Sequence, residues 1–120
     1  MRENDVSIVE RAYQDGLERA RAGRFFDAHE AFETAWRACA DAERDFFQGL
    51  VHVVVSAYQR ERGRPVATER QRLKALRRLA AYEPAHRGLD VTAAPGGVRP
   101  CRARSASAPG RSPCSATSRG

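Results

Sequence analysis

Cysteines are few in this sequence and are poorly placed for a covalent or metal-bound framework. Cys39, Cys101 and Cys114 form no Cys-x-x-Cys pair, and any disulfide would leave one of them over. This spacing argues against a zinc knuckle and against a closed disulfide scaffold of the secreted type. The cysteine usage therefore predicts a protein of the reducing cytoplasm.

Long apolar runs are also missing. The longest uncharged stretch, residues 46–59, is shorter than the roughly 20 residues that a membrane span requires. Gln48, His52 and Gln59 interrupt it, and the amino end lacks the apolar segment of a secretory signal. We therefore expect no membrane association and interpret residues 46–59 as part of a buried helix.

The end of the chain lacks acidic residues altogether. Residues 92–120 contain five arginines but no Asp, Glu, Leu, Ile or aromatic residue, so they cannot bury enough apolar area to offset the entropy of ordering. Residues 1–91 hold 16 of the 21 basic residues and all 15 acidic ones, so the net charge of +6 lies mainly in the tail. The sequence predicts one domain, residues 1–91, followed by a disordered tail over 92–120.

The apolar residues of the predicted domain recur with helical periodicity. Between breaks at Gly23, at 40–42 and at 63–65, apolar residues recur at helical spacing without strand-like alternation. We predict an all-α fold, a small antiparallel bundle of two helix hairpins. The first predicted helix begins near residues 4–7 and ends before Gly23, and the others cover about 27–40, 42–62 and 66–82. The third is central because its apolar arc is the widest.

Local signals predict how these helices begin and which faces they bury. Ser7 and Asp27 are the expected amino-terminal caps, with Glu10 and Glu30 completing capping boxes, and Gly23 should end the first helix in a left-handed conformation. The fourth helix should bury a stripe opposite its basic residues, made up of Leu73, Leu76, Leu79 and Ala80.

One polar cluster stands out on the second and third predicted helices. His29 lies inside the apolar arc of the second helix and Glu33 at its edge, one turn on, and Trp36 follows a further turn along the same face. Glu30, next to His29, is counted with this candidate cluster. Gln48 and His52 form a similar pair on the third helix. We expect the two pairs to face each other across the bundle, because polar groups at such positions need partners.

Two interpretations of this cluster stay open. In the first, His29, Glu33 and Gln48 form a hydrogen-bond network that fixes the helix register. In the second, His29, Glu33 and His52 hold a divalent metal, as facing side-chain pairs do in helical bundles, and support hydrolytic or general acid–base chemistry. The specificity of the pattern is low, since carboxylate-bridged dimetal bundles use the order Glu-x-x-His. No other cofactor is expected.

The same residues carry a resemblance to a known family. The segment from Gly23 to Trp36 with the signature His29-x-x-x-Glu33-x-x-Trp36, the block from Glu43 to Leu50 and the block from Arg87 to Val91 resemble the bacterial and archaeal domain-of-unknown-function family 309. The resemblance implies a small, soluble, all-helical domain without an established activity. It also implies a glutamine at the position of His52 and a further apolar helix after Val91, where this sequence has the arginine-rich tail instead.

The function predicted from these observations is that of a non-enzymatic helical module that binds a protein partner or forms a homodimer. Without the family's final helix, apolar surface should be exposed and should favour such association. The alternatives are the metal-binding or hydrolytic enzyme using the His29 cluster, and weak nucleic-acid binding through the fourth helix and the tail. Nucleic acid is the less favoured partner, because no aromatic residue is interleaved with the basic ones for base stacking.

Overall fold

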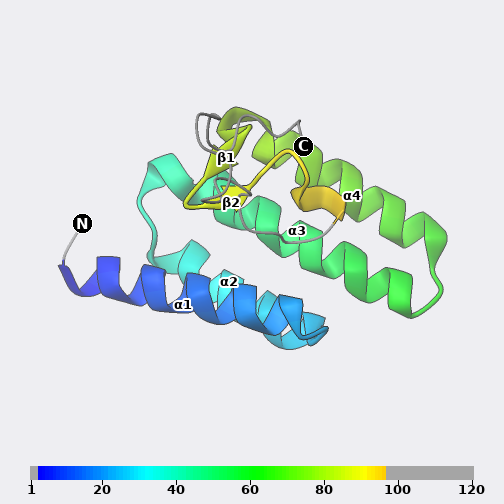
Figure 1. Cartoon of the computed structure of the whole chain (residues 1–120), viewed down its shortest axis with the longest axis horizontal. Coiled ribbons are helices and arrows are strands. Elements are labelled where there is room, and N and C mark those ends of the chain that lie inside the picture. Colours follow the sequence, from blue (N-terminus) through cyan, green and yellow to red (C-terminus); the bar gives the residue numbers. More distant parts are fainter. Residues whose placement is uncertain (1–2, 97–120) are drawn as a thin grey trace, which may run out of the picture.

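The computed structural model describes residues 3–96, and these form the predicted all-α fold. Four helices, α1 (Glu3–Arg21), α2 (Phe25–Ala38), α3 (Arg44–Glu61) and α4 (Pro65–Leu79), account for most of this segment. They form two antiparallel hairpins, one of α1 with α2 and one of α3 with α4 (Figure 1). None of the helices in the described range is long and apolar enough to cross a membrane.

The helices pack in chain order, and α3 is central as predicted. It packs against α2 on one side and α4 on the other, whereas α1 packs mainly against α2. Two glycines permit close approach: Gly16 of α1 lies against the Phe32 ring, and a Cβ added at Gly49 of α3 would lie 2.6 Å from the Leu79 side chain. Small residues at these crossings let the helices come nearer than side chains on both would allow.

The core is apolar and is supplied by all four helices and by the segment that follows them. Its largest fully buried side chains are Val9, Tyr13, Phe32, Phe46, Phe47, Leu50, Val54, Leu79, Leu89 and Val91. Burial of aromatic and aliphatic side chains of this size is the main stabilising contribution to such a fold. The stripe predicted for the fourth helix is only partly confirmed. Leu79 is buried and Leu76 is half-buried, but Leu73 is 48% exposed and Ala80 is exposed as well, and Ala75 is buried instead.

The helix termini differ from the predicted ones. Ser7 lies inside α1 and does not cap it, and α2 begins two residues before Asp27 with Arg24 as its amino-terminal cap residue. The Asp27 Oδ2 atom accepts hydrogen bonds from the Arg24 guanidinium at 2.8 and 3.1 Å, and because Asp27 lies within the first turn of α2 it is not the cap residue. Glu30 is accordingly an exposed helix residue and not a capping-box partner. Gly23 does end the first hairpin turn in the predicted left-handed conformation, with φ of 81°.

A short irregular segment after α4 closes the fold, and the sequence patterns did not predict it. It contains a 3₁₀ turn over Ala80–Tyr82, the two-residue strands β1 (Ala85–His86) and β2 (Leu89–Asp90), which pair antiparallel, and a second 3₁₀ turn over Ala94–Gly96. The last turn packs against α3 and α4. Leu89, Val91 and Ala94 are fully buried, so this segment covers apolar surface that the helices alone would expose.

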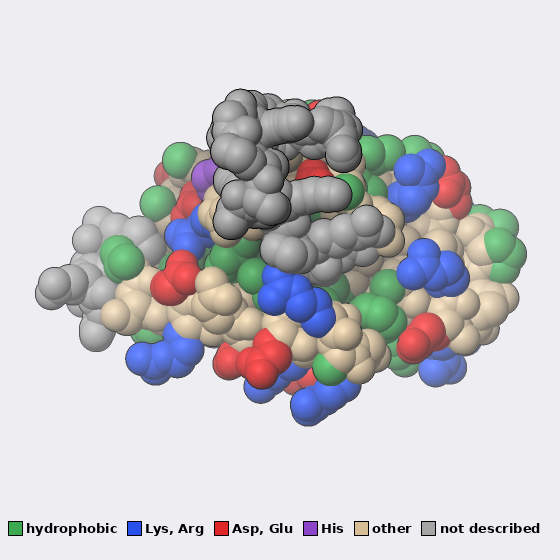
Figure 2. Space-filling model, viewed as in Figure 1, with side chains coloured by type: hydrophobic (Ala, Val, Ile, Leu, Met, Phe, Trp, Pro, Cys, Tyr) green, Lys and Arg blue, Asp and Glu red, His purple; other side chains and the backbone are tan. Residues whose placement is uncertain are grey.

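The predicted domain boundary at Val91 therefore lies within the packed segment, because Ala94 belongs to the core. The remainder of the predicted tail, residues 97–120, lies outside the described residues. On the face shown in Figure 2, acidic and basic side chains are interspersed along α1 at the lower edge, and apolar side chains appear in the band between α1 and the helices above it.

Candidate functional site

Helix α2 brings His29 and Glu33 together, as their spacing predicted. The His29 Nε2 atom lies 3.4 Å from Glu33 Oε2, and the other carboxylate oxygen lies 3.5 Å from the Arg37 guanidinium. Both distances exceed the 2.7–2.9 Å of a strong charge-assisted hydrogen bond. The His29 side chain is 26% exposed and that of Glu33 is 40% exposed, so the pair is partly solvated.

Aromatic and cationic side chains from α2 and α3 surround this pair. The Phe26 ring stacks on the His29 ring with centroids 5.7 Å apart and also lies 6.2 Å from the Tyr58 ring of α3. One turn beyond Glu33, the Arg44 guanidinium lies over the Trp36 ring at 4.4 Å, within cation–π range. The seam between α2 and α3 is thus lined by half-buried aromatic rings, and Phe26 is 56% exposed.

Three side-chain polar atoms, two of them on the α2 residues of this seam, are buried without a hydrogen-bond partner. They are His29 Nδ1, Trp36 Nε1 and Gln59 Oε1, and they make up the complete set of such side-chain atoms within the described residues. The predicted network of His29, Glu33 and Gln48 is therefore not formed, since neither His29 Nδ1 nor the half-buried Gln48 amide makes a side-chain hydrogen bond in this part of the chain. A buried polar atom left unpaired costs free energy, so this seam is less well satisfied than the rest of the interior.

His52 faces the opposite side of α3. Its Nδ1 atom lies 2.8 Å from Gln71 Oε1 of α4, an arrangement in which the ring nitrogen donates to the amide oxygen. Burial lowers the pKa of His52, and the nearby cations Lys74, Arg78 and Arg77 lower it further, against the opposing effect of the Gln71 hydrogen bond. His52 is therefore a half-buried side chain that joins α3 to α4.

The predicted metal ligands are consequently not assembled. His29 and Glu33 lie together on α2, whereas His52 is engaged with α4, and over residues 3–96 no group of three or more His, Cys, Asp or Glu side chains is placed to hold a metal ion. The helical wheel placed His52 at the border of the apolar arc of α3, which does not determine the neighbouring helix that it contacts. The contact with Gln71 shows that it belongs to the α4 side.

The most extensive polar cluster was not predicted as a site. Glu43, in the 3₁₀ turn before α3, accepts hydrogen bonds from Arg87 Nε at 2.7 Å, from Arg87 Nη2 at 2.8 Å and from His86 Nε2 at 2.8 Å. The same guanidinium donates to Glu10 of α1 at 2.6 Å, and the Tyr13 hydroxyl donates to the Arg87 carbonyl oxygen at 2.9 Å. These contacts tie the β1–β2 hairpin to α1 and to the start of α3.

The electrostatics of this cluster follow from its geometry. The hydrogen bonds from Arg87 lower the pKa of Glu43 below its ordinary value, against the opposing effect of partial burial. The same hydrogen bonds raise the pKa of the Arg87 guanidinium, and burial raises that of the Tyr13 hydroxyl. Since both Glu43 oxygens are already occupied, we interpret the cluster as a clasp that holds the hairpin and not as a reactive centre.

A sequence model of the family described as Domain of unknown function (DUF309) matches residues 13–79. The chain belongs to the DUF309 family. The matched range contains α2 and α3 with His29, Glu33 and Trp36, and it ends at the last residue of α4, before the hairpin that carries Arg87. Searches of curated proteins and of solved structures found no match. The function of this DUF309 domain is thus uncharacterised.

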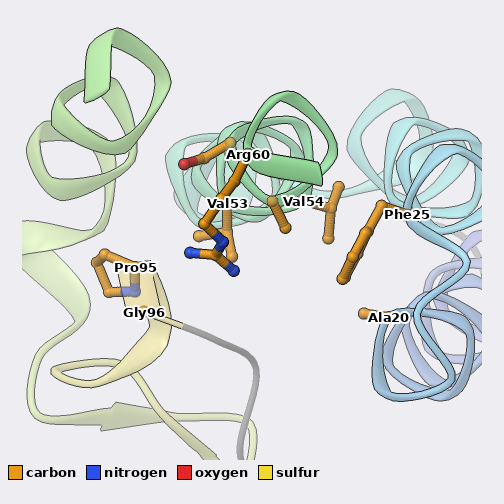
Figure 3. A pocket seen from close by; sticks show the side chains of 9 residues that line it. Ala20, Phe25, Val53, Val54, Arg60, Pro95 and Gly96 are labelled. Atoms are coloured by element: carbon orange, nitrogen blue, oxygen red, sulfur yellow. The ribbon is translucent and has the colours of Figure 1, made fainter. Parts of the chain in front are cut away.

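A pocket of about 130 Å³ lies away from both polar clusters of the DUF309 domain. Its walls come from the ends of α1 and α2, from the second half of α3 and from the last 3₁₀ turn, and are formed by Ala20, Phe25, Val53, Val54, Ser56, Ala57, Arg60, Pro95 and Gly96. The Arg60 side chain extends from α3 into the space between Pro95 and Phe25 (Figure 3). Neither His29 nor Glu43 borders this pocket.

Proposed function

We propose that this protein is a non-enzymatic interaction module that associates with further copies of itself through complementary stripes on α2 and α4. The observation that supports it is the separation of charge between the two hairpins. Helices α1 and α2 hold eight acidic and four basic side chains, whereas α3 and α4 hold three acidic and seven basic ones. A domain with one acidic hairpin and one basic hairpin attracts a second copy in the opposite orientation, because each acidic hairpin then faces a basic one.

The acidic stripe runs along the exposed side of α2. Phe26, Glu30 and Glu33 follow at the spacing that places side chains on one face, and Phe26 is 56% exposed. Across the part of the chain that the structure describes, the Glu30 carboxylate has no ion-pair partner. The stripe therefore offers an aromatic side chain and an unpaired negative charge, a combination suited to the core and rim of an interface.

The basic stripe runs along the outer side of α4 with the matching spacing. Val66, Arg70, Leu73 and Arg77 succeed one another on one face, with 68% of Val66 and 48% of Leu73 exposed. Ion pairs in the described range engage Arg72 and Arg78 of this helix but neither Arg70 nor Arg77. Apolar contact between Phe26 and this stripe, with Glu30 opposite an arginine, would remove exposed apolar area from water while pairing the free charges.

Charge reversal on each stripe tests this proposal. Sedimentation equilibrium of the full chain should show association that weakens when salt is raised from about 0.05 to about 0.5 M, because the charges are at the surface. The variants E30K/E33K and R70E/R77E should each be monomeric. A mixture of the two variants, and a single chain carrying all four substitutions, should associate again, because opposite charges face each other once more.

A matched control separates this pairing from an effect of net charge. The variant R11E/R21E changes the net charge as much as R70E/R77E does, but on exposed positions of α1, and should still associate. A wild-type protein that is monomeric at high concentration and low salt would refute the proposal. So would failure of the mixed variants to associate, or tight binding of a nucleic-acid oligonucleotide by the basic stripe in preference to a second copy.

We place this function in the cytoplasm. Cys39, which is the cysteine within the described residues, is a free thiol whose pKa is raised by burial. A thiol kept protonated and unpaired is compatible with a reducing compartment and has no need of an oxidising one.

A further inference from the structure

The pocket beside Arg60 combines apolar walls with a single cationic group. Phe25, Val53, Val54 and Ala57 present hydrocarbon to its interior. The one polar side chain among the walls other than Arg60 is Ser56, and its hydroxyl already donates to the Thr68 carbonyl oxygen at 3.0 Å. The pocket therefore offers a ligand one strong polar interaction, and that interaction comes from the guanidinium.

The Arg60 guanidinium is available for such an interaction. It projects into the space between Pro95 and Phe25 (Figure 3), and over residues 3–96 no carboxylate lies within ion-pair distance of it. In contrast, the Arg78 guanidinium of α4 is engaged with Asp45 at 2.8 Å. A guanidinium binds a carboxylate through two parallel hydrogen bonds, so a carboxylate is the group that fits it best.

The size of the pocket limits the rest of the ligand. Its volume of about 130 Å³ is slightly below the roughly 150 Å³ of a cavity that accommodates benzene. It is well below the roughly 300–1,000 Å³ of sites that bind drug-sized molecules, which excludes nucleotides and other large ligands from full burial. A short hydrocarbon chain of about five or six carbon atoms fills such a space.

From these observations we infer that the pocket binds a short aliphatic monocarboxylate, with the hydrocarbon chain between Phe25 and Val54 and the carboxylate on Arg60. The walls come from α1, α2, α3 and the last 3₁₀ turn, so an occupant contacts both hairpins and the closing segment at once. The site is separate from the stripes proposed for self-association, and its occupancy does not depend on that proposal.

Titration of the full chain with sodium acetate, butyrate, hexanoate and octanoate, followed by methyl NMR, tests the inference. Methyl signals of Val53, Val54 and Ala57 should shift. Those of Val9, a buried residue of α1 that does not line the pocket, should not shift. Affinity should rise about fourfold for each added methylene up to hexanoate, as expected for buried hydrocarbon, and should gain little with octanoate.

Variants distinguish the two parts of the proposed interaction. Arg60→Gln should weaken hexanoate binding about tenfold or more, because the charge-assisted hydrogen bonds are lost, and should leave the weaker binding of hexanamide unchanged. Ala57→Leu should weaken the binding of both hexanoate and hexanamide, because the larger side chain fills the pocket. Arg64→Gln replaces an exposed arginine outside the pocket and should change the binding of neither ligand. Shifts that are independent of chain length, equal in the wild type and Arg60→Gln, or absent from the pocket methyls would overturn the inference.

Discussion

Arg87 and Glu43 form a two-point ion pair across 44 residues of sequence, with Nε to Oε2 at 2.7 Å and Nη2 to Oε1 at 2.8 Å. Arg87 holds this position in a left-handed backbone conformation, with φ of 51°, at the turn of the β1–β2 hairpin. Its guanidinium also lies over the Phe47 ring at 5.3 Å. The pair therefore links the segment after α4 to the start of α3 and to the core residue Phe47.

Loss of the Arg87 side chain should destabilise the fold. Replacing Arg87 by Gln leaves the Glu43 carboxylate, only 20% exposed, without its main partner, and we expect a loss of about 1–3 kcal/mol in the free energy of unfolding. Urea denaturation followed by circular dichroism measures this. As a control, Arg78→Gln removes the more exposed pair with Asp45 and should cost no more than about 0.5 kcal/mol. Equal losses in the two variants would show that the clasp does not support the fold.

The lowered pKa of Glu43 predicts a specific dependence of stability on pH. A carboxylate whose pKa is lower in the folded state than its ordinary value of 4.5 stabilises the fold above that value, and the stabilisation is lost as the pH falls through the folded-state pKa. The variant Glu43→Gln should be less stable than the wild type at neutral pH, and the difference should shrink as the pH falls below about 4.5. Denaturation curves measured at a series of pH values test this. A difference that stays constant down to low pH would contradict the assignment.

The close packing of α3 on α4 predicts that a single methyl group at Gly49 is harmful. A Cβ there would lie 2.6 Å from the Leu79 side chain, so the helices would have to move apart. We expect Gly49→Ala to lower the free energy of unfolding by about 1–3 kcal/mol, although alanine favours the helix more than glycine does. Gly96→Ala makes the same substitution where, among the described residues, no atom would lie within 4 Å of the added Cβ, and it should be nearly neutral. Thermal denaturation of both variants tests whether the loss at Gly49 comes from packing.

The separation of His52 from His29 and Glu33 predicts how the protein responds to zinc. Trp36 lies one turn beyond Glu33, so its fluorescence reports on the surroundings of the pair. If zinc changes this fluorescence, Glu33→Gln should reduce the change, because the amide lacks the negative charge, whereas His52→Gln should leave it unaltered since His52 is bound to Gln71. A His52→Gln variant with weakened zinc binding would show that the three residues act together after all.

The stability of the Glu33 variants gives an independent measure of the pair on α2. At 3.4 Å and with Glu33 40% exposed, its contact with His29 should contribute no more than about 0.5 kcal/mol. Glu33→Gln and Glu33→Ala should therefore unfold at nearly the same denaturant concentration as the wild type. A loss of 1 kcal/mol or more in Glu33→Ala alone would show that a tight hydrogen-bond network exists in solution.

The helices and their order were predictable from the sequence because the signals that specify them are local. Apolar periodicity identified all four helices and the central position of α3, and Gly23 adopts the left-handed conformation expected of a glycine at the end of a helix. The spacing of four residues between His29 and Glu33 likewise ensured their contact on one helix. Exact termini were less predictable, since α2 begins at Phe25, two residues before Asp27, without a side-chain cap that the sequence could signal.

Tertiary structure alone decided which side chains meet between distant segments. A helical wheel placed His52 at the edge of an apolar arc, and only the packing of α4 against α3 determined that its partner is Gln71 and not His29. The strands β1 and β2 have two residues each, too few for any periodicity to indicate them, and their place is fixed by the clasp of Arg87 with Glu43 and Glu10. Helix formation depends on residues three and four apart, which the sequence displays directly, whereas these contacts depend on how the finished helices pack.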